Sequence, residues 1–171
     1  MKLSKVVALS SLCTAMASVL LVVGAYFPTL SYSCIFLASV VVLLPLSKDT
    51  YKGAVFTVIA SALLSFLLAG VSFETALPYL VFFGFHPIVN KVFKEKKVNK
   101  FLAYLIKDVW FVGAMLICYL LTDMFVTDNE VFKKYMIYII IIGGSVLFIV
   151  YDYMMFYFQR AMDVIAKRLK I

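Results

Sequence analysis

Four ionisable residues lie within strongly apolar segments of this 171-residue chain: His86, Lys107, Asp108 and Asp152. A charged side chain in hydrocarbon costs about 2.5–3.5 kcal/mol on insertion scales, so each group is expected to face protein or a water-filled cavity. Lys107 and Asp152 lie at similar depths in neighbouring apolar segments, which favours an ion pair between them. This polar layer either clamps helices together or takes part in coupling or gating. A third hypothesis is catalysis by Asp108, Asp152 and His86, but no nucleophile accompanies them.

Other reactive residues are sparse. The chain has one histidine, which excludes an HExxH metal site, and it contains no GxSxG elbow, glycine-rich phosphate loop or Walker sequence. Cys13, Cys34 and Cys118 stand apart in apolar runs without CxxC spacing, so neither a metal site nor a disulfide framework is indicated. The sequence therefore predicts no catalytic residue, no metal and no other cofactor, and it lacks any motif for ATP hydrolysis.

Tyrosines and a few polar residues gather near one set of segment ends. As candidates for a ligand site these are Tyr26, Thr29, Tyr32, Glu74, Tyr79, Tyr119 and Tyr138. Tyrosines at helix ends usually form an interfacial belt. The alternative is a pocket for an aromatic or heterocyclic ligand, because such pockets combine apolar walls with few polar anchors.

The elements that must position these residues follow from composition. Hydrophobic residues make up 65% of the chain, and its mean hydropathy is +1.05. Soluble domains contain about 45–50% apolar residues. A chain of 19.3 kDa has too much surface to hide so many apolar side chains. The expected fold is therefore an all-α polytopic helix bundle in a lipid bilayer.

The apolar runs predict one transmembrane domain of about six helices and an amphipathic tail. The helices are expected over 6–27, 33–46, 51–69, 73–93, 101–126 and 131–158, and the tail over 159–171. The first run continues to Phe27, which favours a retained helix over a cleaved secretory signal. The second run is short, and Pro78 and His86-Pro87 interrupt the fourth. Because about 20 residues cross a bilayer, five crossings and one re-entrant segment remain the alternative.

The charge pattern predicts the orientation. With the N-terminus in the cytoplasm, all of the 16 Lys and Arg residues except Lys133 and Lys134 fall on the cytoplasmic side. The outer loops carry Glu74, Asp123, Asp128 and Glu130. The positive-inside rule therefore predicts that both termini are cytoplasmic. It also accounts for the net charge of +7, so a nucleic-acid partner is not indicated.

Small residues form a stripe along the first segment. Ala8, Ser11, Ala15 and Ser18 recur at spacings of three and four, which places them on one helix face. Small residues let helix backbones approach closely in a membrane. The stripe is expected either to pack within this chain's own bundle or to form a docking face for another membrane subunit.

One segment resembles a known family. The stretch Lys5-Val-Val-Ala-Leu-Ser-Ser-Leu-Cys-Thr-Ala-Met-Ala-Ser18, running on to Tyr26-Phe-Pro28, resembles the first helix of substrate-binding S components of energy-coupling-factor transporters. The length, the six short helices, the internal termini and the missing ATP motif are similar too. The segments 83–89 and 151–153 resemble bacterial membrane proteins of this general kind.

The resemblance implies a function and partners. It implies uptake of a vitamin-like or other micronutrient substrate across the bacterial cytoplasmic membrane, with a transmembrane coupling subunit and cytoplasmic ATPases as partners. It also implies docking through small residues of the first helix, often in an AxxxA pattern, for which Ser11 and Ala15 are the nearest match. The family's substrate sites lie in the outer half, so the layer of Lys107 and Asp152 would be too deep to bind ligand. The alternative is a non-catalytic scaffold subunit, such as the rod-shape morphogenesis proteins, which have a similar size and helix count.

Overall fold

The computed structural model describes residues 3–70, 73–122 and 130–168, and for residues 130–133 it describes the backbone alone. Within these residues the regular structure is helical and no strand occurs. The elements are α1 (Leu3–Tyr26), η1 (Pro28–Leu30), α2 (Ser31–Leu46), α3 (Tyr51–Leu68), α4 (Phe73–Pro78), η2 (Tyr79–Phe83), α5 (His86–Glu95), α6 (Lys100–Leu121) and α7 (Glu130–Arg168). The all-α prediction is confirmed.

Six stretches among the described residues are long and apolar enough to cross a membrane. They are Leu3–Tyr26, Pro28–Leu46, Tyr51–Leu68, Phe73–Glu95, Lys100–Leu121 and Lys134–Arg168. The second stretch reaches 19 residues because the short helix η1 leads directly into α2. This number agrees with the predicted count of six and indicates a multi-pass membrane protein.

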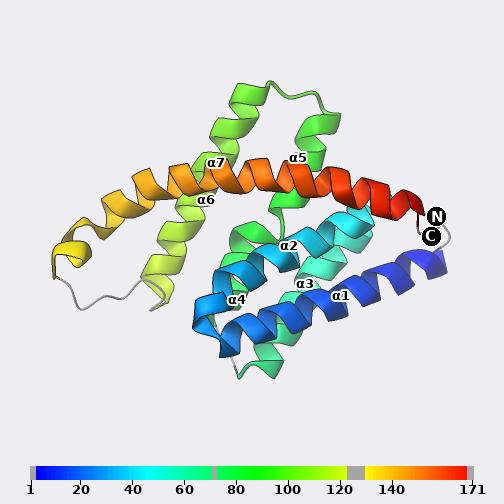
Figure 1. Cartoon of the computed structure of the whole chain (residues 1–171), viewed down its shortest axis with the longest axis horizontal. Helices are drawn as coiled ribbons and strands as arrows, with labels where there is room; N and C mark the ends of the chain where they lie inside the picture. Colours follow the sequence, from blue (N-terminus) through cyan, green and yellow to red (C-terminus); the bar gives the residue numbers. More distant parts are fainter. Residues whose placement is uncertain (1–2, 71–72, 123–129, 169–171) are drawn as a thin grey trace.

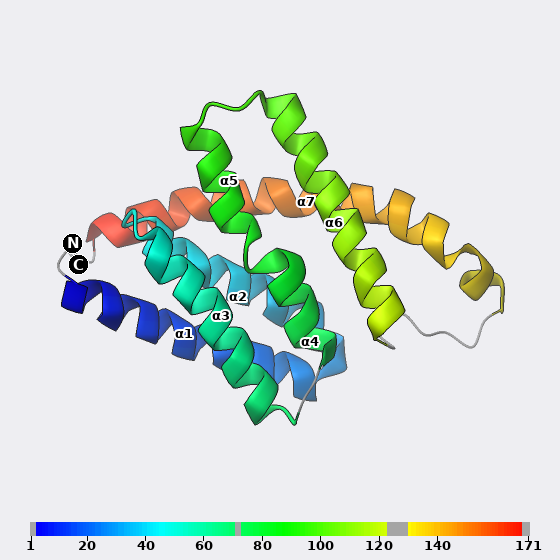
Figure 2. The same cartoon turned by 180° about the vertical axis from the view of Figure 1, so that it is seen from behind.

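The fourth stretch is broken where its prolines predict. Pro78 ends α4, a π-helical segment (η2) follows, and Pro87 lies in the first turn of α5. Proline lacks the N–H that a continuous helix needs, and π-helical turns accommodate such local mismatch. Figure 2 shows the resulting break between α4 and α5. His86 begins the new helix directly after the break.

Two boundaries differ from the sequence-based expectation. α7 continues without interruption through 159–168, so the described part of the predicted tail belongs to the same helix. At 39 residues it is about 58 Å long, roughly twice the hydrocarbon thickness of a bilayer. α6 ends at Leu121 and Thr122 is already extended, whereas 123–126 of its predicted range lie outside the described residues.

The helices α1, α2 and α3 pack closely together, while α7 crosses the molecule against α2 and α6 (Figure 1). The α1–α2 contact depends on Gly24, where a Cβ atom would lie 2.9 Å from Cys34 Cβ. No larger residue would allow this approach without a shift of the helices.

Aromatic rings fill the centre of the molecule. Phe82 of η2 is fully buried, and its ring centroid lies 4.8 Å from that of Trp110 and 4.9 Å from that of Phe111, both on α6. Tyr151 and Phe148 of α7 contact the same ring at 5.7 and 6.1 Å. Ring contacts in this range stabilise beyond simple area burial. They hold the broken fourth stretch against α6 and α7 and so position the polar residues beside it.

Candidate functional site

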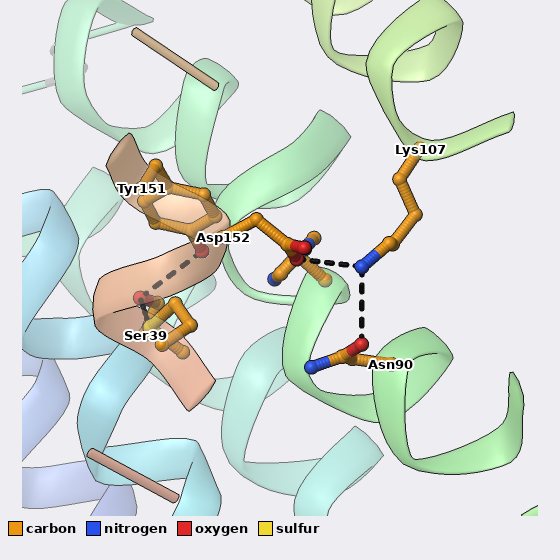
Figure 3. A network of polar contacts seen from close by, with 7 residues as sticks. Ser39, Asn90, Lys107, Tyr151 and Asp152 are labelled. Atoms are coloured by element: carbon orange, nitrogen blue, oxygen red, sulfur yellow. Dashed lines mark hydrogen bonds and ion pairs between the residues drawn. The ribbon is translucent and has the colours of Figure 1, made fainter. Parts of the chain in front are cut away.

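Three of the four ionisable residues predicted to form a polar layer meet in the structure. Lys107, about two turns into α6, donates to Asp152 Oδ1 on α7 at 2.6 Å (Figure 3). His86 Nε2, at the start of α5, lies 3.0 Å from the same oxygen. The carboxylate only accepts, so the ring is the donor through Nε2–H. The pairing of Lys107 with Asp152 is therefore present, and His86 extends it to a third helix.

The ion cluster of His86, Lys107 and Asp152 is well buried. His86 and Lys107 are 0% and 4% exposed, whereas the side chain of Asp152 is 24% exposed. Lys107 also donates to Asn90 Oδ1 at 3.1 Å (Figure 3). Sequence reasoning missed Asn90, although it follows His86 by four residues and so shares its helix face. With its charges paired and no serine, threonine or cysteine among its members, the cluster has the composition of a clamp between α5, α6 and α7.

Asp108 does not join this cluster. Its Oδ2 accepts a hydrogen bond from Ser145 Oγ of α7 at 3.2 Å, and its buried Oδ1 has no hydrogen-bond partner among the described residues. Ser145 and Asp152 are seven residues, or about 10 Å, apart along α7, so Asp108 and Lys107 reach α7 at different levels. The predicted layer is therefore two separate contacts between α6 and α7.

A third polar contact ties α7 to α2. The hydroxyl groups of Ser39 and Tyr151 lie 3.5 Å apart, and Ser39 also donates to Phe36 O at 2.7 Å. Figure 3 shows Tyr151 pointing toward Ser39 while Asp152 points toward Lys107. Two adjacent residues of α7 thus connect it to opposite sides of the bundle.

An apolar cavity of about 800 Å³ lies between α2, η2, α6 and α7. Most of its walls are aliphatic, aromatic or methionine side chains. The polar side chains among its lining residues are Tyr32, Ser33 and Tyr151, and no charged residue of the described chain lines it. The volume falls within the range of about 300–1,000 Å³ that is usual for small-molecule pockets. We call this feature the α2–α7 cavity.

Most residues proposed from sequence for a ligand site do not line this cavity. Tyr32 does, but Tyr79 is fully buried elsewhere, with Ser61 donating to its hydroxyl at 3.2 Å. Tyr119 is half-buried, and the remaining candidates are exposed: Tyr26, Thr29, Glu74 and Tyr138. The structure does not bring the seven residues together, and their role in ligand binding stays a prediction.

The cavity contains residues that sequence reasoning did not select. Phe36, Phe111 and Met115 line it, as do the adjacent residues Gly143 and Gly144 of α7. A glycine pair in the middle of an apolar helix is a detectable signal, because glycine is unfavourable there. The aromatic residues gave no such signal, since they look like ordinary core positions.

The stripe on α1 divides between two environments. Ser18 is buried and donates to Thr14 O at 2.8 Å, but Ala8, Ser11 and Ala15 are exposed. The face that packs inside is shifted around the helix and contains Leu9, Ser10, Cys13, Thr14, Ala17 and Ser18. Packing within this chain's own bundle therefore does not account for Ala8, Ser11 and Ala15.

Lysines join several helix ends at one end of the molecule. Lys91 of α5 donates to Leu46 O at 2.5 Å and to the carboxylate of Asp49. Lys48 donates to Ala166 O of α7 at 2.6 Å. These contacts place the ends of α2, α5 and α7 together, and the first turn of α1 lies at the same end (Figures 1 and 2).

No protein-family model, curated protein or solved structure matches this chain. Among the described residues, no three His, Cys, Asp or Glu side chains are placed to hold a metal ion. The fold and the site define a class: a multi-helix protein with six stretches able to cross a membrane, a buried ion cluster and an apolar cavity.

Proposed function

We propose that this chain is the substrate-binding integral membrane subunit of a micronutrient uptake transporter of the energy-coupling-factor type, with no chemistry of its own. The observation that carries the proposal is the α2–α7 cavity, which has the volume and wall composition of a small-molecule pocket. The sequence offers no ATP motif, so the energy for uptake comes from separate ATPases.

The chain is placed in the bacterial cytoplasmic membrane with both termini in the cytoplasm. The contacts of Lys48 and Lys91 support this orientation, because they gather basic helix ends on one side. In this orientation Tyr32 and Ser33, at the start of α2, lie in the outer half. The cavity then extends from the outer half to the middle of the membrane, where a substrate from outside is expected to bind.

The exposed face of α1 supplies a docking surface for the coupling subunit. Ala8, Ser11 and Ala15 are small, exposed and adjacent on one helix, which suits close helix packing in lipid. The same face also suits a scaffold subunit that assembles a membrane complex without binding a substrate.

Co-purification separates the two functions. The tagged full chain is expressed in a bacterial membrane, extracted in mild detergent, and its partners are identified by mass spectrometry. We expect an ATPase-bearing complex with the wild-type chain and its loss in Ala15→Phe, whose ring would fill the docking face. Met16→Phe is the matched control, because Met16 is 49% exposed and points about 100° away. A stable complex without any ATPase would contradict the transporter assignment and favour the scaffold.

A further inference from the structure

The described residues that line the α2–α7 cavity carry no formal charge. The polar residues among them are Tyr32, Ser33 and Tyr151, and the Tyr151 hydroxyl lies 3.5 Å from that of the buried Ser39. An ion placed among such walls would lose its hydration without gaining a partner, which is strongly unfavourable. A neutral apolar molecule would instead gain from leaving water, and a hydroxyl or carbonyl group on it has the exposed hydroxyl group of Ser33 as a partner.

The nearest charged groups are already engaged. Asp152 follows Tyr151 in the chain, but its carboxylate accepts from Lys107 and lies 3.0 Å from His86 Nε2. Figure 3 shows that the side chains of Tyr151 and Asp152 leave α7 in different directions. The ion cluster therefore does not supply a counter-ion to the cavity.

Two glycines in the cavity wall have no packing reason within the described chain. A Cβ atom at Gly143 would meet nothing within 4 Å, and one at Gly144 would come no closer than 3.7 Å, to Phe111. At Gly84, by contrast, a Cβ atom would lie 2.7 Å from Val58. Glycine inside a helix is destabilising relative to alanine. The pair at Gly143 and Gly144 is explained if the space above it is used by an occupant.

The shape and rim of the cavity indicate what that occupant is. Aromatic rings of Phe36, Phe111 and Tyr151 contribute to its walls, and such rings pack favourably on the edges and faces of another ring system. The rim residues Leu147 and Val150 are 65% and 54% exposed, so the approach to the cavity is apolar. A molecule that enters past them arrives from the lipid phase.

We propose that the α2–α7 cavity binds a neutral, largely apolar, ring-bearing molecule that carries a hydroxyl or carbonyl group and enters from the lipid. The molecule packs over Gly143 and Gly144, and its polar group reaches the hydroxyl group of Ser33. This inference rests on the proposed substrate-binding function and names the class of substrate. It excludes charged micronutrients as the cargo of this cavity.

A matched pair of probes tests the charge requirement. The probes are 1-pyrenebutanol and 1-pyrenebutyrate, which share a ring system and differ in charge. Trp110 is the only tryptophan of the chain and is adjacent to Phe111 of the cavity wall, so energy transfer from Trp110 to pyrene reports binding. In nanodiscs that contain the full chain we expect saturable transfer with the alcohol, and affinity for the carboxylate weaker by about tenfold or more.

Two leucine substitutions at open glycines control for partition into the bilayer. Gly143→Leu fills the cavity and is expected to abolish saturable transfer. Gly113→Leu is the matched control, because a Cβ atom at Gly113 also meets nothing within 4 Å but Gly113 does not line the cavity. It is expected to retain wild-type binding. Both variants are checked for folding by size-exclusion chromatography.

The outcomes separate this inference from the proposed function. Equal binding of the two probes, still lost in Gly143→Leu, overturns the neutral class but leaves substrate binding in place. Transfer that does not saturate, or that persists in Gly143→Leu, overturns the cavity as the binding site. Loss of a co-purifying partner in Gly143→Leu, without any probe binding in wild type, assigns the groove to a partner's helix and overturns the inference. The ATPase co-purification decides the proposed function independently.

Discussion

The buried ion cluster gives a prediction whose size follows from its geometry. Asp152→Asn removes the charge that neutralises Lys107, a residue that is 4% exposed and keeps Asn90 Oδ1 as an acceptor at 3.1 Å. Breaking a buried ion pair costs about 3–5 kcal/mol, and the lower end of about 3 kcal/mol applies because the asparagine oxygen still accepts. Lys107→Met is expected to cost less, about 1.5–3 kcal/mol, because the Asp152 side chain is 24% exposed and can be hydrated.

The double variant Asp152→Asn/Lys107→Met removes both charges of the ion pair. We expect its cost to fall short of the sum of the two single variants by about 2 kcal/mol, a coupling typical of residues in direct contact. The free energy of unfolding is measured for the full chain in mixed detergent micelles with increasing dodecyl sulfate. Trp110 is a suitable probe, because it packs against the central ring of Phe82 at 4.8 Å.

Asp163→Asn provides the matched control on the same helix. Asp163 is partly exposed and has no ion pair among the described residues, so its cost is expected to stay within about 0.5 kcal/mol. Additivity of the Asp152 and Lys107 substitutions to within about 0.5 kcal/mol would refute the reasoning. It would mean that the two groups do not stabilise each other in the folded chain.

Two further predictions concern packing and orientation. Gly84→Ala brings a Cβ atom within 2.7 Å of Val58 and is expected to lower the free energy of unfolding by about 1–3 kcal/mol. Gly113→Ala, at an open position, is expected to be neutral or stabilising in the same micelle assay. Equal effects of the two substitutions would contradict this packing. Lys96→Cys and Glu74→Cys replace exposed residues on opposite sides of the proposed membrane. A membrane-impermeant maleimide added to intact cells is expected to label only the Glu74 variant, and the reverse pattern would overturn the orientation.

The helices were predictable from sequence because length and hydropathy alone decide them. Each apolar run is close to the length that a bilayer requires, and Pro78 and Pro87 mark the break in the fourth. The ion pair was predictable because an unpaired charge in an apolar run is unfavourable and therefore needs a partner. Charged residues are rare in such runs, so few candidate partners exist. His86 and Lys107 satisfied this condition, and both contact Asp152.

The buried side of each helix was harder to predict. α1 carries small residues around much of its circumference, so the sequence does not distinguish the buried Ala17 from the exposed Ala15. In lipid the outer face is as apolar as the inner face, and hydropathy therefore gives no direction. Tyr79 illustrates the same difficulty, because its hydroxyl group is satisfied by Ser61 of α3, a partner 18 positions earlier in the chain. The cavity was not predictable because its walls come from four separate elements.

The cavity and the ion cluster share one turn of α7, and this arrangement tests whether the cluster couples or only clamps. Tyr151 lines the cavity, and Asp152 binds α5 and α6. Coupling requires that a ligand changes the arrangement of this turn, in which case loss of the cluster must alter affinity by about fivefold or more. None of the cluster's residues lines the cavity, and their charges are paired with one another. We therefore expect Asp152→Asn to leave the affinity for 1-pyrenebutanol within about twofold, below that threshold, at temperatures where the variant is folded. A larger fall in affinity without unfolding would show that the cluster transmits occupancy of the cavity to α5 and α6, and would assign it to gating.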